Sequence, residues 1–134
     1  MSIYNIAREP DFTDIDLSLT RNRRTRDIAT ISGIDAIVTS VENLVNMNFY
    51  EKPFQPHIGS NVRKLLFENI TAFTASFIES AVGEVIVNFE PRVKLIQVTA
   101  IPTPEENGYD VHIVFGVNGA ERQVQINTFL TRVR

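Results

Sequence analysis

The hydrophobic pattern of the chain changes from a helical to a strand period near Arg92. Between residues 32 and 90, apolar side chains recur every three or four positions, the spacing that defines one face of a helix. Beyond residue 92 they alternate with polar residues, as on strands with one buried face. The order predicts an α+β fold in which a helical half, residues 32–90, precedes a β half, residues 91–134.

The helical half divides into about three helices. The first begins near Ser32, because Ser32 and Asp35 have the spacing of a capping box. A short second helix follows Ser60 or Asn61, and the third begins near Thr71 or Thr74. Pro91 disfavours helical geometry at the residue before it and ends the third helix. The residues expected to face the core are Ile34, Ile37, Val41, Leu44 and Val45 in the first helix, and Phe77, Ile78, Ala81, Val82, Val85 and Ile86 in the third.

The β half predicts a three-stranded antiparallel meander. The alternation is strictest from Tyr109 to Val117, and a phase slip at Leu95–Ile96 indicates a β-bulge. Asn118–Gly119 is typical of a two-residue hairpin turn. A turn there sets Ile113 opposite Val124, so that apolar side chains share one face. Such a meander leaves two edges with unpaired backbone groups, which favour strand addition by another chain.

Residues 1–31 show little periodicity and carry a basic cluster, Arg21 to Arg26, which predicts an extended arm. The whole chain of 134 residues, 1–134, fits one domain. Acidic residues flank the basic cluster and no aromatic platform accompanies it, so direct binding of nucleic acid is not expected. The N-terminus lacks the apolar segment of a signal peptide, and no apolar run approaches the ~20 residues that span a bilayer, so no membrane contact is expected.

Composition narrows the chemistry further. The chain has no cysteine, which excludes disulfides, thiolate metal sites and a cysteine nucleophile, and fits synthesis in a reducing cytoplasm. The two histidines, His57 and His112, have no partner at ligand spacing. The net charge of −3 gives no overall basic field. We expect no metal, no cofactor and no catalytic residue.

The triplet Glu90-Pro91-Arg92 has two readings that physics alone leaves even. It can be a helix stop with a surface ion pair worth about 0–1 kcal/mol. It can also be a rigidly presented charge pair that docks a partner, because proline fixes the direction in which the two side chains leave the backbone.

Several segments together resemble one known family. These are Pro53-Phe54-Gln55-Pro56, Gly59-Ser60-Asn61, Leu66-Phe67-Glu68 and Phe89-Glu90-Pro91-Arg92, supported by Asp14-Ile15-Asp16 and the Arg21–Arg26 region. They resemble the small baseplate wedge proteins of contractile phage tails, which also occur in type VI secretion and related injection machines. The resemblance implies a structural component of the virion tail baseplate, made in the host cytoplasm and present in symmetric copies.

The family resemblance also implies sites and partners. The C-terminal β half is similar to the interlocking-strand domain of the sheath subunit, so it would offer a strand edge to the first sheath ring and start sheath polymerisation. The residues expected at that contact are Val124, Gln125, Ile126, Asn127, Thr128, Phe129 and Leu130. The helical half would anchor to the wedge core and to other wedge proteins, with tube or hub proteins as further candidates. The residues expected there are Glu90, Pro91, Arg92, Phe54, Pro56, Phe67 and Glu68.

Two alternatives remain open. The family has long carried a lysozyme-like label, and a glycosidase needs two carboxyl groups ~5–9.5 Å apart, one with a raised pKa. Glu68, Glu79, Glu84 and Glu90 are the candidates. Glu79 and Glu84 are expected to be solvated, and Arg92 would lower the pKa of Glu90. The second alternative is a generic assembly adaptor that makes no sheath contact.

Overall fold

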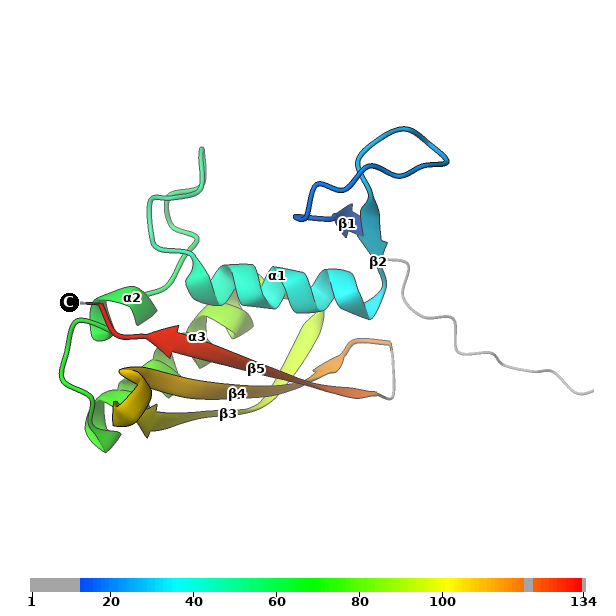
Figure 1. Ribbon diagram of the computed structural model, residues 1–134. Coiled ribbons are helices and arrows are strands. Elements are labelled where there is room, and N and C mark those ends of the chain that lie inside the picture. Colours follow the sequence, from blue (N-terminus) through cyan, green and yellow to red (C-terminus); the bar gives the residue numbers. More distant parts are fainter. Residues whose placement is uncertain (1–12, 120–121, 134) are drawn as a thin grey trace, which may run out of the picture.

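In a computed structural model, which describes residues 13–119 and 122–133, the chain has the predicted α+β order. The helices are α1 (Ile34–Asn46), α2 (Val62–Leu65) and α3 (Ala72–Phe89), with a short 3-10 turn, η1 (Pro104–Glu106), between two strands. The strands are β1 (Thr13–Ile15), β2 (Thr30–Ser32), β3 (Val93–Thr103), β4 (Gly108–Val117) and β5 (Gln123–Thr131). Figure 1 shows the helices α1 and α3 alongside the three-stranded antiparallel sheet β3-β4-β5.

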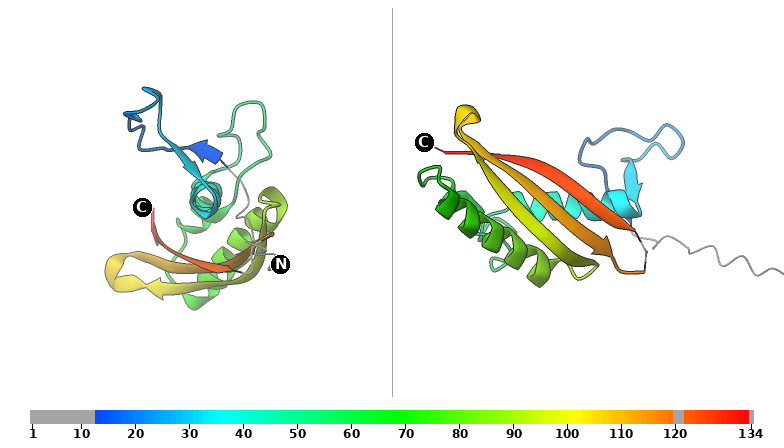
Figure 2. Two further views of the ribbon diagram at one scale, coloured as in Figure 1. Left: turned by 90° about the vertical axis from the view of Figure 1, so that its right-hand side faces the viewer. Right: turned by 90° about the horizontal axis from the view of Figure 1, so that it is seen from below.

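The sheet has one covered and one open face. Helices α1 and α3 lie on the same side of the sheet, which curves around them (Figure 2). Strand β4 is the middle strand, and its alternate residues Tyr109, Val111, Ile113, Phe115 and Val117 are all buried in the core. Burial of a large apolar side chain contributes about 1.5–3 kcal/mol, so this strand anchors the sheet to the helices. The strict alternation seen in the sequence is confirmed.

The bulge is confirmed, but the predicted hairpin register is wrong by two residues. The pairing of β3 with β4 shifts between Leu95 and Gln97, at the predicted phase slip. Ile113 faces Ile126 rather than Val124. The connection between β4 and β5 is longer than a two-residue turn, because the regular pair nearest to it is Gly116 with Gln123. A shift of two residues keeps the same side chains on the buried face, so the sheet keeps its apolar side.

Helix α1 begins later than predicted. Its N-cap is Gly33 with φ 65°, no side chain caps it, and Ser32 lies in β2. The capping box of Ser32 and Asp35 is therefore wrong. A glycine is suited to this position, because a positive φ lets the chain turn directly from strand to helix. The predicted inward residues from Ile37 to Val45 are buried.

Helix α3 has the predicted ends but exposes one predicted core residue. The Thr71 hydroxyl accepts the Thr74 N–H at 3.1 Å, and the helix ends before Pro91. Phe77 is 49% exposed and packs edge-to-face on Phe73 with ring centroids 4.8 Å apart. By length and composition alone α3 could cross a bilayer, contrary to expectation, but core helices meet the same criterion. Its buried side packs against β3.

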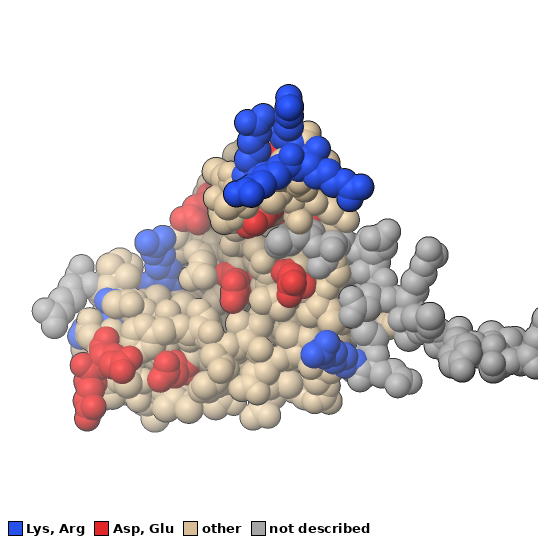
Figure 3. Space-filling model, turned by 45° about the vertical axis from the view of Figure 1, so that its right-hand side comes forward, with Lys and Arg blue, Asp and Glu red and all other residues tan. Residues whose placement is uncertain are grey.

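The N-terminal arm is partly ordered as a two-stranded ribbon. Strands β1 and β2 pair antiparallel, with Asp14 opposite Ile31, whereas residues 1–12 of the predicted arm lie outside the described residues. The connection between the two strands carries Arg21, Arg23, Arg24 and Arg26, all exposed. Figure 3 shows basic side chains gathered at the projecting tip, with acidic groups beneath it and over the body of the domain.

Candidate interaction surfaces

Strand β5 forms one edge of the sheet and turns the backbone groups of alternate residues outward. Neighbouring residues of a strand direct their N–H and C=O groups to opposite sides. The Arg132 N–H donates to the Asn107 carbonyl at 2.8 Å, which continues the β4–β5 ladder through even-numbered positions. The outward groups therefore belong to the odd-numbered residues Gln125, Asn127 and Phe129. Among residues 13–119 and 122–133 no other strand pairs with this edge.

The predicted contact strand thus separates into two sets of residues. Ile126 and Leu130 are buried in the core, and Val124 and Thr128 are half-buried on the same face. These four side chains pack on the covered face of the sheet and hold the strand in place. Gln125, Asn127 and Phe129 are exposed, and both their backbone and their side chains are accessible. Only this second set can offer groups directly to an incoming strand.

The open face beside this edge is polar. His112 Nδ1 lies 2.7 Å from Asn127 Oδ1, and the Gln125 amide donates to the same oxygen at 3.2 Å. Strand β5 carries no charged residue and no proline from Gln123 to Thr131. Natural sheets usually protect exposed edges with such residues, so β5 is an unprotected edge.

A groove runs beside the C-terminal half of this strand. Its lining comes from α1, α2 and β5, and includes Asn46, Arg63, Phe129 and Arg132. The Val133 N–H donates to the Leu66 carbonyl at 3.0 Å and closes the far end against α2. The edge of β5 therefore borders a hollow in which side chains of an added strand have room.

Glu90-Pro91-Arg92 forms a junction of four elements rather than a surface ion pair. The Glu90 side chain is 3% exposed, and its carboxylate accepts bonds from Arg92 Nε at 2.6 Å and Arg92 Nη2 at 2.7 Å. Ser40 Oγ of α1 donates to the same carboxylate at 2.5 Å. Asn118, just after β4, donates to the carbonyls of Pro91 and Arg92. The surface reading of this pair is wrong, because the fold encloses the carboxylate.

The electrostatics of the pair follow from this enclosure. Burial raises the pKa of Glu90, but hydrogen bonds from Arg92 and Ser40 and the Arg92 charge lower it by more, so the net pKa is below its ordinary value. The predicted direction is confirmed. The hydrogen bonds of Glu90 in turn raise the pKa of Arg92, to which Asp14 of β1 adds a smaller contribution. Within this chain, the triplet presents outward only Pro91 and part of the Arg92 guanidinium, whose side chain is 27% exposed.

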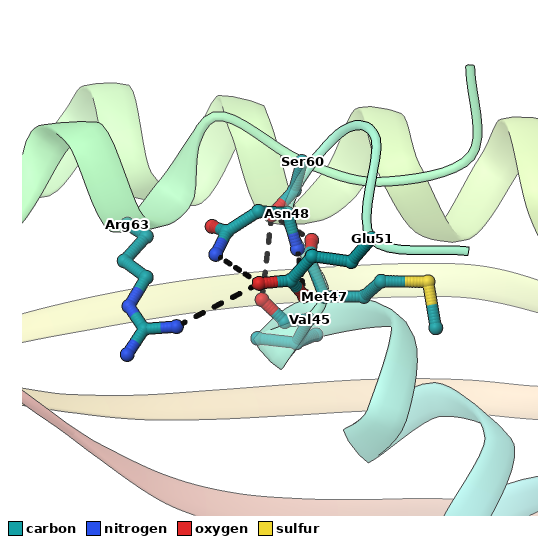
Figure 4. A network of polar contacts seen from close by, with 6 residues as sticks. All are labelled: Val45, Met47, Asn48, Glu51, Ser60 and Arg63. Atoms are coloured by element: carbon teal, nitrogen blue, oxygen red, sulfur yellow. Dashed lines mark hydrogen bonds and ion pairs between the residues drawn. The ribbon is translucent and has the colours of Figure 1, made fainter. Parts of the chain in front are cut away.

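The loop between α1 and α2 is fixed by polar contacts (Figure 4). The Ser60 N–H donates to the Met47 carbonyl at 3.0 Å, and its hydroxyl donates to the Val45 carbonyl at 3.3 Å. The Glu51 carboxylate accepts both the N–H and the side-chain amide of Asn48. A Cβ on Gly59 would lie 2.5 Å from the backbone of Asn48 and Phe49. Gly59 and Ser60 therefore lock this loop onto the end of α1.

The remaining predicted partner-binding residues lie on two segments: Phe54 and Pro56 on this loop, and Phe67 and Glu68 just after α2. Pro56 and Phe67 line one hollow together with Tyr50 and His57. Phe54 is fully exposed and Glu68 is exposed, and neither lines that hollow. All four side chains are accessible, but the structure does not gather them into one patch.

Two features escaped sequence reasoning. Glu79, expected to be solvated, accepts the Ala100 N–H of β3 at 2.8 Å. A single glutamate on a helix gives no sequence signal for such a contact. The exposed pair Phe73 and Phe77 was hidden for a different reason: α3 is apolar on both faces, so helical periodicity does not tell the inner from the outer side. The high apolar content of the whole helix was the one available sign that an apolar side chain faces outward.

Comparisons with known proteins place these surfaces in context. Residues 32–122 match the model of the family described as "Baseplate wedge protein gp25". Baseplate wedge protein gp25 of Enterobacteria phage T4 is 28% identical over 106 residues, covering 79% of this chain and 80% of that protein. Two solved structures share the fold. A Geobacter sulfurreducens protein described as a tail lysozyme has TM-score 0.70 and 22% identity, covering 75% of this chain and 92% of its own. A chain of the six-fold symmetrised anti-feeding prophage baseplate has TM-score 0.65 and 19% identity, covering 97% and 93%.

Proposed function

The chain belongs to the family of baseplate wedge protein gp25, structural components of the contractile tail baseplate, and from this premise we propose that it starts sheath polymerisation. In this proposal, the free edge of β5 accepts a strand of the first sheath ring, while the helical half anchors the protein to the wedge core. Other baseplate proteins are its partners.

The observation that carries the sheath proposal is the unprotected edge of β5. Backbone groups of Gln125, Asn127 and Phe129 point outward from an uncharged strand. Strand addition uses such groups for affinity, and alternate side chains for specificity. Because the strand is fixed from below by Ile126 and Leu130, it is already in the conformation that pairing requires, so little further ordering opposes binding.

Support for anchoring comes from the apolar side chains left exposed on the helical half. Phe73 and Phe77 form an aromatic pair on the outer face of α3, and Phe54 and Phe67 are exposed on the segments between α1 and α3. Exposed aromatic groups are enriched at protein interfaces. We assign these residues to the wedge contact, together with Pro91 and Arg92, which follow the end of α3.

Site-directed cross-linking tests the sheath contact. The chain has no cysteine, so Asn127→Cys gives a single thiol at the β5 edge. In assembled tails treated with a short thiol-reactive photocross-linker, we expect a covalent product with the sheath subunit, identified by mass spectrometry. Thr99→Cys is the matched control, because register places Thr99, His112 and Asn127 in one row across the sheet. A stronger product from Thr99→Cys, or none from Asn127→Cys, would contradict the proposal.

We propose further that the protein is not a hydrolase, although a protein of this fold is described as a tail lysozyme. A general acid needs a raised pKa, whereas the pKa of the buried Glu90 is lowered. Purified protein incubated with peptidoglycan should release no more soluble fragments than buffer. Turnover that disappears in any one of Glu68→Gln, Glu79→Gln, Glu84→Gln or Glu90→Gln would restore the enzymatic alternative.

A further inference from the structure

The second edge of the sheet, formed by β3, differs from the β5 edge in how its backbone groups are used. The Ala100 N–H leaves the sheet to reach Glu79 of α3, although Ala100 is paired with Val111 of β4. The outward positions in this half of β3 are therefore the even-numbered residues Val98, Ala100 and Pro102. An added strand would have to bond to these groups.

Three features interrupt this edge along its length. The β-bulge at Ile96 breaks the regular spacing of the outward groups. At Ala100, the Glu79 carboxylate occupies the N–H at 2.8 Å and places a helix side chain where a new strand would lie. Pro102 has no N–H to donate at the next outward position. Bulges, prolines and inserted charges are the means by which natural sheets prevent edge pairing.

None of these features occurs in β5. Its pairing with β4 is continuous from Gly108–Thr131 to Gly116–Gln123, and it contains neither proline nor charge. The described residues include no side chain bonded to an outward backbone group of Gln125, Asn127 or Phe129. The two edges of one small sheet are thus opposite in character.

We propose that Glu79 closes the β3 edge against strand addition, so that an incoming strand of a partner joins at β5 only and each copy accepts one strand. This assignment deepens the proposed sheath contact by fixing which edge serves it, and it rests on that contact for its biological meaning. The closure itself is a property of the isolated protein and is tested there.

Amide hydrogen exchange and self-association test the closure. In Glu79→Ala, loss of a charge-assisted hydrogen bond should speed exchange of the Ala100 amide about tenfold or more. By analytical ultracentrifugation the variant should also associate more strongly than wild type, because an opened β3 edge adds to the β5 edge that both proteins leave unpaired. Glu84→Ala removes the same charge from an exposed position of the same helix and should behave as wild type. Glu79→Gln keeps an accepting oxygen and should restore protection.

A strand peptide distinguishes failure of this inference from failure of the sheath proposal. The probe is a synthetic peptide with the sequence of residues 123–131, added to isotope-labelled protein and followed by NMR. We expect shifts confined to β5 in wild type, with additional shifts in β3 for Glu79→Ala. Shifts in β3 of the wild type, or an unchanged Ala100 exchange rate in Glu79→Ala, would overturn the closure. Binding at neither edge, with the faster Ala100 exchange retained, would uphold the closure and count against strand addition at β5.

Discussion

Replacing Gln125 by proline should abolish sheath assembly while leaving the protein folded and present in the baseplate. The Gln125 N–H points away from β4, so proline removes no bond of the existing ladder. A proline at a backbone position compatible with its φ changes stability by only about 1 kcal/mol. At the outer edge, however, it deletes a donor and places ring atoms in the path of an added strand.

Electron microscopy of tails and quantification of the baseplate-bound protein measure this result. We expect baseplates with normal amounts of the variant but tube without sheath. Gln125→Ala is the matched control, because it removes the same side chain and keeps the N–H, and it should assemble sheath normally. Ile126→Pro is the folding control: it removes an N–H turned toward β4 and should destabilise the sheet itself. Normal sheaths on Gln125→Pro particles would favour the adaptor that makes no sheath contact.

Replacing Arg92 by alanine should destabilise the isolated domain strongly. Among the described residues, the change leaves the Glu90 carboxylate, 3% exposed, with the Ser40 hydroxyl as its remaining side-chain hydrogen-bond donor. Removal of one partner of a buried ion pair costs about 3–5 kcal/mol. Because Arg92 is itself partly exposed, water can replace some of the lost bonds, and we expect a loss near the lower end, about 3 kcal/mol. That corresponds to a fall in Tm of roughly 10 °C for a domain of this size.

The surface pair of Arg63 and Glu51 supplies the control. Its atoms are 3.9 Å apart and its side chains are 60% and 48% exposed. Such pairs contribute about 0–1 kcal/mol, so Arg63→Ala should scarcely move the thermal transition. Equal effects of Arg92→Ala and Arg63→Ala would show that the enclosed junction contributes no more than an ordinary surface charge.

The same junction predicts the acid limb of the stability curve. The pKa of Glu90 is lowered on folding from an ordinary value of 4.5. A group with a depressed folded pKa adds stability above its unfolded pKa, and that stability is lost as the pH falls through the folded pKa. The free energy of unfolding of wild type, measured with denaturant, should therefore fall as the pH drops below about 4.5. The dependence should be shallower in Glu90→Gln, which cannot titrate, and an identical acid limb would contradict the assignment.

The element types and the buried face of the sheet were predictable because they depend on local periodicity. Alternation in β4 and the helical spacing from Ile37 to Val45 each require only the neighbours in the chain. The bulge at Ile96 was visible for the same reason, since an extra residue shifts the alternation. The hairpin register was not, because Asn118–Gly119 indicates a turn but not the number of residues that the turn contains.

The sequence by itself determined an α+β chain whose last strand is uncharged and apolar on one side, with a proline that ends the long helix before the sheet. Only the tertiary structure decided which edge is open. That depends on Glu79 reaching Ala100 across 21 positions, and on the register that turns Gln125 and Asn127 outward. It also enclosed Glu90 between Arg92 and Ser40, and the Ser40 contact joins residues 50 positions apart. Periodicity reports which side of an element is apolar, whereas the partner of a single polar group is set by packing between distant segments.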